Sequence, residues 1–534
     1  MALRWARLVR DRKSKGRQGG KSCEDFRIIH FPPKVSAINR LPVEILSIIF
    51  SYEDDPAWRS PGLHFALRHE AVLSQVCRLW RAITLNMPFL WNRIALVHYD
   101  EHIVAQTYAL LKRSKRVPLE IRVDWRPLWD LRHADYAAAY EGPVDYRREA
   151  LRDALSALTR HVARWQLLLI RVDNQEVMQD ALSAIASCSS APLLEHLCLA
   201  APTCNEEGRE VPFDYSSALF SCSMPSLTYL SLRNSPSHWC GASTTGSLTV
   251  LKLHLPYDIP SASYADFMEM LARSPLLQVF WLSCVHTFEG YEDWVGERVL
   301  LPELEKLSFH NIGPDLGSKL LACLAITNLK RLELNLPDCW GSYETFVQEL
   351  VTPYPETGQT ILHSVTGLRV ESIACQVDIL SSMLYCLPKL SVLFIDHCHS
   401  SVFYLVLMRY MAQSIAENTE PQDEYTPLLL PLLDTVVLGD SDALVVRCLV
   451  EWRLMVDRRL RRLFVDSKMI MDIEEEDRLV EQLDVFGRVL TSPGKELMLD
   501  LDEVMDNLIT TPKDCVHVIP APTEQPPNTI ALCR

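Results

Sequence analysis

The sequence has little glycine and no long apolar run, and each shortage excludes a class of protein. Only 18 of the 534 residues are glycine, which excludes a collagen-like chain. The most apolar stretches, residues 402–408 and 427–437, are far shorter than the roughly 20 residues that a membrane-spanning helix needs, so we expect no membrane partner. The 16 cysteines form no C-x-x-C pair, which predicts reduced thiols in a cytoplasmic or nuclear protein.

Sequence signatures of catalysis and metal binding are missing as well. The chain contains no G-x-x-x-x-G-K-[ST] phosphate loop, no G-x-S-x-G nucleophile elbow and no H-E-x-x-H zinc helix. The nearest approach to a metal site is His397-Cys398-His399, but neighbouring strand residues point to opposite faces and cannot grip one ion together. We therefore predict a protein that is not an enzyme and that holds no cofactor or metal. An unrecognised pocket with perturbed titratable groups would be the sign of an enzyme.

The net charge of −15 predicts a protein partner rather than a nucleic acid, because the phosphate backbone favours clustered lysine and arginine. One basic block does occur, at residues 1–37, and it lacks the apolar core of a secretory signal. Such a block of like charges predicts a disordered tail, although a nuclear-import signal or a transit peptide has a similar composition. Residues 512–534 are rich in proline and predict a second disordered tail.

A helical pattern begins near residue 38. Pro42 suits a first helical turn, and Glu44 lies favourably near the positive end of the helix. The apolar surface of this helix is too wide for one small packing partner, since it comprises Leu41, Ile45, Leu46, Ile49 and Phe50. After a polar loop at Glu53–Pro61, the helical spacing returns at Leu73, Val76, Cys77, Trp80 and Thr84, and Met87-Pro88-Phe89-Leu90-Trp91 closes the segment.

Together the motifs L-P-x-E-I-L-x-x-I-F, L-x-x-V-C-x-x-W-R and P-x-L-W resemble the F-box, particularly the version common in fungal proteins. The resemblance covers about a tenth of the chain. It implies a three-helix domain at residues 38–96 that docks on the Skp-type adaptor of a cullin–RING ubiquitin ligase. The positions that motif matching assigns to adaptor contact are Leu41, Pro42, Ile45, Leu46, Ile49, Val76, Cys77 and Trp80.

The chain departs from the F-box pattern between Glu53 and Glu70, where it is longer and more polar. The pattern therefore does not establish that the middle helix is ordered. The residues alone allow a second interpretation, in which the apolar positions form the core of an ordinary helical hairpin.

Leucine-rich units of the form L-x-x-L-x-L recur behind this segment. They begin at Leu194, Leu227, Leu248, Leu277, Leu304, Leu329, Val365, Leu390, Leu433 and Leu460. Weaker candidates lie at residues 119–123 and 165–170. Each unit predicts one short strand with alternate leucines pointing inward, joined by a return segment that looks helical at Tyr264–Leu271 and Leu316–Ala325. Since no unit can bury its apolar edge alone, the units are expected to stack.

The predicted fold is α/β: the three-helix F-box, then an irregular leucine-rich-repeat solenoid at residues 97–470, a curved parallel sheet with helices on the convex side. The Asn or Cys that this repeat family places before the next inward leucine is matched only by Cys398, so a doubly wound sheet is the alternative. From Met471 the chain becomes charged, with a helix-like stretch from Glu474 to Leu490, and we predict that residues 471–511 cap the open end.

Residues that alternate with the inward leucines are expected on the concave face. Basic and histidine side chains gather there in the middle units, which predicts attraction for an acidic or phosphorylated segment. Trp281 and Phe394 are predicted to be exposed aromatic anchors. The candidate target-binding residues are Tyr229, Lys252, His254, Trp281, Lys306, His310, Arg331 and Phe394.

These patterns and the resemblance together predict the substrate-recognition subunit of an SCF-type cullin–RING ubiquitin ligase. Its partners would be the Skp-type adaptor and an unknown protein target. The alternative is a non-catalytic leucine-rich-repeat scaffold in which the F-box-like segment is only an N-terminal cap.

Overall fold

The computed structural model describes residues 37–489 apart from 53–68, 98–101, 126–143, 173–174, 201–222, 235–245, 256–262, 285–287, 289, 293–295, 337–340, 356, 396–404, 411–428, 440–442, 467–468 and 472. The predictions made for the two tails, for the polar loop after the first helix, for the motif at 397–399 and for residues 490–511 lie outside this part. The chain divides into two compact units, Met1–Met87 and Pro88–Arg534.

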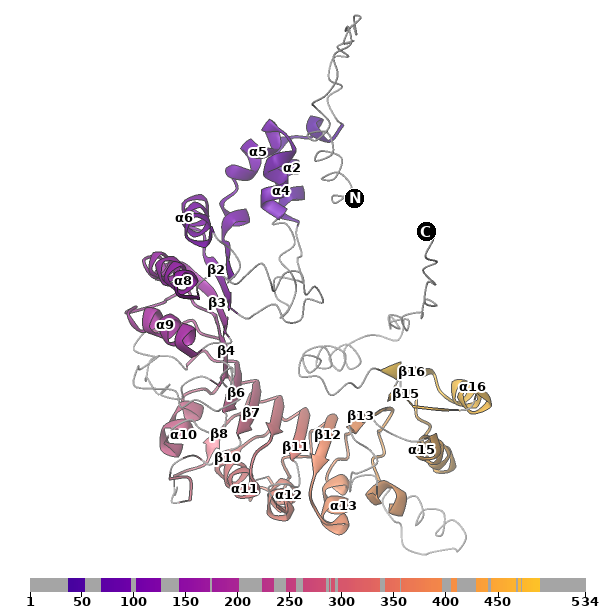
Figure 1. Ribbon diagram of the computed structural model, residues 1–534. Coiled ribbons are helices and arrows are strands. Elements are labelled where there is room, and N and C mark those ends of the chain that lie inside the picture. Colours follow the sequence, from indigo (N-terminus) through magenta and orange to yellow (C-terminus); the bar gives the residue numbers. More distant parts are fainter. Residues whose placement is uncertain are drawn as a thin grey trace, which may run out of the picture. The chain divides into compact units, whose positions relative to one another are not determined.

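The first unit is helical. It contains the 3-10 helix η1 (Ala37–Arg40) and the helices α2 (Val43–Ser51), α4 (His69–Val76) and α5 (Arg78–Leu85) (Figure 1). Each α-helix contributes at least one buried apolar side chain to a small core. These side chains are Leu46 and Phe50 of α2, Leu73 of α4 and Ile83 of α5. The helical N-terminal region that the motifs predict is thereby confirmed.

The second unit is built on one long sheet. In the described part of the chain, 14 strands lie side by side in the order in which they follow in the sequence, and every neighbouring pair is parallel. They are β1 (Arg93–Val97), β2 (Leu119–Trp125), β3 (Trp165–Val172), β4 (His196–Ala200), β5 (Tyr229–Arg233), β6 (Val250–Leu255), β7 (Val279–Cys284), β9 (Lys306–His310), β11 (Arg331–Leu336), β12 (Gly367–Ile373), β13 (Val392–Ile395), β14 (Thr435–Leu438), β15 (Arg462–Asp466) and β16 (Val485–Val489). Two short strands, β8 (Val299–Leu300) and β10 (Leu324–Ala325), pair separately.

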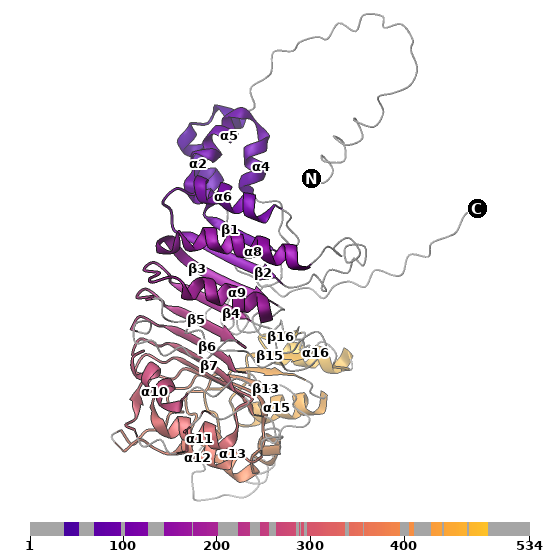
Figure 2. The ribbon, with the colours of Figure 1, turned by 60° about the vertical axis from the view of Figure 1, so that its left-hand side comes forward.

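Helices connect many of these strands, and in Figure 1 they lie on one side of the sheet. Figure 2 shows two of them, α8 and α9, in front of the strands near β3. Within the described residues the connecting helices are α6 (Ile103–Arg113), α8 (Val144–Thr159), α9 (Gln175–Ala186), α10 (Tyr264–Ala272), α11 (Pro314–Cys323), α12 (Glu344–Val351), α13 (Val377–Tyr385), α15 (Ala443–Met455) and α16 (Ile473–Gln482), with the 3-10 helices η2 (Pro88–Trp91) and η4 (Val162–Arg164). None of the helices in these residues has the length and hydropathy of a membrane span.

The leucines of the repeats stack in register on the helical side of the sheet. Leu230 of β5 lies beside Leu251 of β6, which lies beside Phe280 of β7, and Phe280 lies beside Leu307 of β9. The ring of Phe280 lies 6.2 Å from that of Phe267 on α10, so helix and strand share one core. We call this side of the sheet the leucine face and the other side the second face. Burial of each large apolar side chain stabilises the unit by roughly 1.5–3 kcal/mol.

The parallel sheet expected from the leucine pattern is confirmed, and the doubly wound alternative is wrong. A doubly wound sheet reverses its strand order at a switch point, whereas no reversal occurs among the described strands. The helical return segments are confirmed as α10 and α11, except that the last two residues of the second, Leu324 and Ala325, form β10.

Two details of the chain differ from the sequence expectations. Residues 93–96, which the motifs placed at the end of the N-terminal domain, belong to β1 of the sheet. The charged stretch expected to remain helical to Leu490 ends its helix at Gln482 and continues as β16. The β-branched and aromatic residues Val485, Phe486 and Val489 favour a strand and outweigh the helix-forming charges before them.

Candidate adaptor-binding surface and second face of the sheet

Helix α2 presents only one side to the core of the first unit. The carbonyl of Pro42 accepts a hydrogen bond from the N–H of Leu46 at 3.0 Å, which starts the helix. Leu46 and Phe50, four residues apart on the same side, are 0% and 1% exposed. The Phe50 ring lies 4.7 Å from the ring of Trp80 on α5. These contacts fix which side of α2 points away from the core.

The other side of α2 is apolar and exposed. Ile45, Ile48 and Ile49 expose 43%, 60% and 44% of their surface. Soluble proteins rarely gather so many exposed apolar side chains on so short a segment unless a partner covers them. Further members lie at the start and end of α2 and on α4 and α5. We name the whole set the apolar surface: Leu41, Val43, Ile45, Ile48, Ile49, Tyr52, Val72, Val76 and Leu79.

Three of the eight residues assigned to adaptor contact make contacts within the unit. Leu46 is fully buried, so its assignment as a contact residue is wrong. Cys77 is half-buried and caps α5, since its Sγ accepts the N–H of Trp80 at 3.5 Å. Trp80 is also half-buried, and its Nε1 donates to Oδ1 of Asn39 at 2.8 Å. Adaptor contact by Cys77 and Trp80 stays a prediction.

Four of the remaining five, Leu41, Ile45, Ile49 and Val76, belong to the apolar surface, and Pro42 is exposed beside them. The motif matching missed Val43, Ile48, Tyr52, Val72 and Leu79. A signal for two of them was present, because Ile48 and Tyr52 are spaced i, i+4 and so share a stripe.

The last part of the motif belongs to the second unit. Trp91 is 3% exposed, and the guanidinium of Arg113 on α6 lies 4.4 Å from the centre of its ring. A cation held over a tryptophan face in this way is attracted by the ring electrons. Trp91 therefore anchors α6 of the sheet unit, and the compact first unit ends at Met87.

On the second face, Trp281 of β7 lies between two histidines. Its ring is 6.0 Å from that of His254 on β6 and 5.1 Å from that of His310 on β9. Tyr229 of β5 similarly lies 5.5 Å from His196 of β4. The structure thus brings three of the eight candidate target-binding residues, His254, Trp281 and His310, into one aromatic row across β6 to β9. Tyr229 lies in register with Val250 instead and forms a separate pair with His196.

Charged side chains follow in the next strands. Lys306 Nζ of β9 lies 2.8 Å from Oε1 of Glu333 on β11, and Ser308 Oγ donates to Oε2 at 2.7 Å. Glu333 is 7% exposed. Burial opposes its charge, but Lys306, Ser308 and Arg369 of β12 together hold the pKa of the carboxyl below its ordinary value. The positive character expected of Lys306 is therefore balanced by a buried carboxylate.

Two of the candidate target-binding residues are less accessible than predicted. Phe394 is 1% exposed, and Arg369 covers it with its guanidinium 4.7 Å from the ring centre. His310 is 3% exposed. The prediction that Phe394 is an exposed anchor is wrong, because a neighbouring strand supplies a side chain long enough to lie over it. Lys252, Trp281 and Arg331 are half-buried, and a role for them in target binding stays a prediction.

The cysteine on this face is not an activated nucleophile. Burial raises the pKa of the Cys198 thiol to about 11, although the nearby charges of Arg171 and Lys252 oppose the shift. A thiol with so high a pKa stays protonated near neutral pH and reacts slowly. Among the described residues, no group of three or more His, Cys, Asp or Glu side chains is placed to hold a metal ion.

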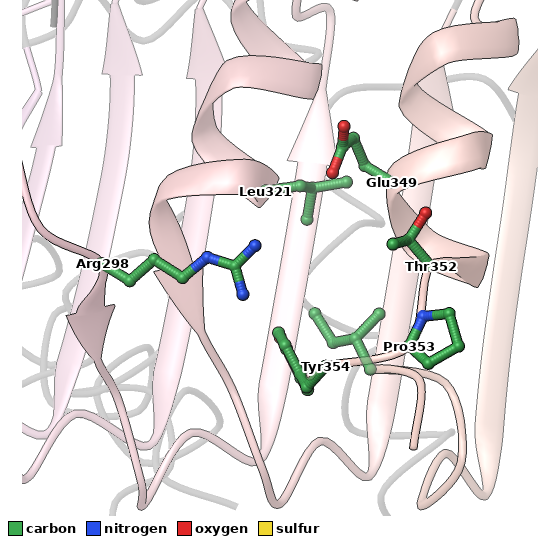
Figure 3. Close-up of a pocket in the computed structure, with 7 residues that line it drawn as sticks. Arg298, Leu321, Glu349, Thr352, Pro353 and Tyr354 are labelled. Carbon is green, nitrogen blue, oxygen red and sulfur yellow. The ribbon is translucent and has the colours of Figure 1, made fainter. Parts of the chain in front are cut away.

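Two hollows lie among the helices, away from all the predicted site residues. The smaller is lined by Arg298, Leu321, Glu349, Thr352, Pro353, Tyr354 and Ile361, and Figure 3 shows Arg298 reaching in from one side toward Tyr354. The guanidinium lies 5.6 Å from the Tyr354 ring centre, and the Tyr354 hydroxyl accepts the N–H of Ile326 at 3.2 Å. The cavity measures about 20 Å³, enough for about one water molecule.

The larger hollow is an open groove of about 680 Å³ between α10 and β8. Asp266, Glu269 and Glu297 give it carboxylates, and Leu300, which is 58% exposed, gives it an apolar wall. The sequence offered no signal for this groove, because its walls come from segments separated by an irregular connection.

The comparisons with known proteins bear on the first of these surfaces. No curated protein matches the chain. Residues 38–97 match the family model described as F-box-like, a span that runs from η1 through the apolar surface to β1. The chain therefore carries an F-box-like domain at residues 38–97, which is the resemblance that its motifs predicted.

Proposed function

We propose that this protein is the substrate receptor of an SCF-type ubiquitin ligase and that its F-box-like domain binds the Skp-type adaptor. The observation that carries the proposal is the apolar surface, which lies on the F-box-like domain and projects away from the domain's own core. A helix with an unburied apolar side is suited to a hydrophobic groove on a partner. The chain itself then performs no chemistry, and the ligase reaction belongs to its partners.

We propose further that the second unit is an irregular leucine-rich-repeat solenoid and that its second face binds the target. Two features support this: parallel strands that follow one another in sequence order across the sheet, and the row of His254, Trp281 and His310 on the side away from the helices. Aromatic side chains dominate the energetics of protein interfaces. A scaffold without ligase association lacks a comparable explanation for the apolar surface.

The adaptor part is tested by co-purification of the full chain with a Skp-type adaptor. Ile45→Asp and Ile48→Asp should each abolish capture without lowering the melting temperature, because both side chains are exposed and a buried unpaired charge at an interface costs several kcal/mol. The matched control is Leu276→Asp, a similarly exposed leucine of the sheet unit at 49%, which should leave capture unchanged. Capture that persists in both isoleucine variants would contradict the proposal.

The target part is tested separately, once a target has been recovered with the wild-type chain. Lys252→Glu with Arg331→Glu should reduce target recovery while adaptor capture stays at the wild-type level. Lys306 is unsuitable for this test, because its partner Glu333 is buried. Unchanged target recovery in the double variant would refute recognition through this part of the second face.

A further inference from the structure

The groove between α10 and β8 is open because the wall that α10 gives it is made of small side chains. Ala265 and Ala272 both line it, and since they are seven residues apart they lie on one side of the helix. Each leaves room where a longer side chain would reach toward β8. The resulting volume of about 680 Å³ falls within the roughly 300–1,000 Å³ that binding sites usually have.

One edge of β8 has no strand beside it. Val299 and Leu300 are in register with Leu324 and Ala325 of β10, and the N–H of Leu301 donates to the carbonyl of Ala325 at 3.0 Å. Backbone groups alternate between the two edges of a strand, so the N–H and C=O of Leu300 point away from β10. In the described chain no backbone group bonds either one.

This unpaired edge faces the groove. Helix α10 packs beside β8, and α11 packs beside β10, an order that can be followed in Figure 1. The side of β8 turned away from β10 is therefore the side turned toward α10. An unpaired strand edge is a template on which an extended segment of another chain can pair.

The walls of the groove are acidic. Asp266 and Glu269 of α10 and Glu297 before β8 line it. Glu269 forms an ion pair with Arg273 one turn further along the helix. Within the described residues no cation is paired with Asp266 or Glu297, so two carboxylates remain to attract a positive charge.

Arg298 also lines the groove, but its charge is directed elsewhere. Its guanidinium lies 5.6 Å from the ring centre of Tyr354, and Figure 3 shows it reaching into the smaller cavity. The groove therefore keeps its excess of negative charge. Lysine or arginine side chains are complementary to it, and an acidic segment would be repelled.

Leu300 adds an apolar contact beside the unpaired backbone groups. It exposes 58% of its surface. Pro302 ends the row of edge groups, because proline has no N–H. Helix α10 has nine residues and is about 13.5 Å long, which equals about four residues of an extended chain. The occupant that fits is therefore a short extended segment.

We propose that the groove between α10 and β8 binds a basic segment of a partner protein in an extended conformation. The segment pairs with the edge of β8 at Leu300. Because side chains alternate along a strand, its lysine or arginine residues face Asp266 and Glu297 while the residues between them pack on Leu300. The site is opposite in charge to the one proposed on the second face, whose test residues Lys252 and Arg331 are basic, so the two sides of the sheet select different segments.

The first test measures binding of a fluorescent six-residue peptide, in which lysine and valine alternate, to the full chain. Binding should be saturable, and Asp266→Lys with Glu297→Lys should weaken it at least about fivefold, since two attractive charge contacts become repulsive. The control is Asp378→Lys with Glu474→Lys, which reverses side chains that are 78% and 84% exposed elsewhere and should change the affinity less than about twofold.

Equal weakening by the two double variants would show attraction to the acidic chain as a whole and would overturn the proposal, as would the absence of saturable binding. The apolar contact has its own matched pair. Leu300→Asn should weaken binding, whereas Leu432→Asn, at a leucine that is also 58% exposed, should not. The same affinity in both asparagine variants would exclude Leu300 from the site.

The pairing with β8 is tested with two peptides methylated on alternate backbone nitrogens. The N–H groups that face β8 belong to every second residue, so one methylated peptide should bind at least about fivefold more weakly than the other, because it loses hydrogen bonds to the strand edge. Equal affinities of the two methylated peptides would refute strand pairing.

A second copy of the chain is the competing occupant of the groove. Sedimentation of the full chain alone distinguishes it: we expect no self-association through this groove, and a dimer that Leu300→Asn dissociates would assign the groove to a second copy and overturn the proposal. None of these experiments involves the adaptor, so their failure is distinguishable from failure of the proposed ligase function.

Discussion

Replacing Glu333 by Gln should destabilise the sheet unit, although the two side chains have nearly the same shape. Glu333 accepts a contact of 2.8 Å from Lys306 and a hydrogen bond of 2.7 Å from Ser308 in a site that is 7% exposed. The amide keeps one acceptor oxygen but removes the charge that faces Lys306 and Arg369. Removal of one partner from a buried ion pair costs about 3–5 kcal/mol, and we expect the lower end because the hydrogen bond from Ser308 survives.

The assay is urea unfolding of the full chain at pH 7, with Glu305→Gln as the matched control. Glu305 pairs with Lys330 one position away from the strands, but both side chains are nearly half exposed, so its loss should cost no more than about 1 kcal/mol. A Glu333→Gln variant that unfolds at the wild-type urea concentration would refute the reasoning.

The same pair predicts a dependence on pH. Folding lowers the pKa of Glu333 because Lys306, Ser308 and Arg369 outweigh the effect of burial. The stabilisation is therefore fully present above the unfolded pKa of about 4.3 and is lost as the pH falls toward the lower folded pKa. The difference in stability between wild type and Glu333→Gln should accordingly shrink below about pH 4, and a difference that stays constant down to pH 3 would contradict the ionised state.

Three further variants test the packing. Arg453→Met should lower the free energy of unfolding by about 3 kcal/mol, because the buried guanidinium of Arg453 donates to three backbone carbonyls. Its control is Arg447→Met on the same helix, where the side chain is 47% exposed and the change should be less than about 0.5 kcal/mol. Equal effects of the two variants in urea unfolding would show that the buried guanidinium does not stabilise the unit. Gly487→Val should cost about 1–3 kcal/mol, since a Cβ there meets a Phe464 ring carbon at 2.8 Å, and Phe464→Ala in the same chain should recover part of the loss in calorimetry. Trp80→Ala should lower the melting temperature of the first unit, unlike Ile45→Asp, and an unchanged melting curve would show that its bond to Asn39 is dispensable.

The leucine pattern predicted the sheet well because its signal is local. Each L-x-x-L-x-L unit contains its own strand, and the alternation of side chains along a strand is fixed by backbone geometry. The units at Leu227 and Leu248 lead directly into β5 and β6. The strand β1 escaped prediction because Arg93–Val97 carries only half of the leucine pattern and follows a motif with its own interpretation.

The candidate site was harder to predict because exposure depends on neighbours distant in sequence. Leu46 and Ile45 are adjacent and equally apolar, yet one is fully buried and the other is 43% exposed. The difference arises where α5 packs against α2 through the rings of Trp80 and Phe50, which are 30 positions apart in the sequence. Helical periodicity identifies a wide apolar surface, but only the packing partner decides which stripe of that surface stays outside.

The buried charges of the second face also depend on neighbours that are distant in sequence, which the register of the strands brings together. Ser308, Glu333 and Arg369 belong to three different repeat units, and each is an ordinary polar residue when its own unit is considered alone. Parallel stacking in register makes them neighbours, so one carboxylate lies between side chains from the strands on either side. A shift by a single residue in any one strand would turn its polar side chain into the leucine core, where a charge has no partner. The irregular spacing of the units is therefore absorbed mainly in the connections, because these strands keep their register as far as the shift that follows Leu334 in β11.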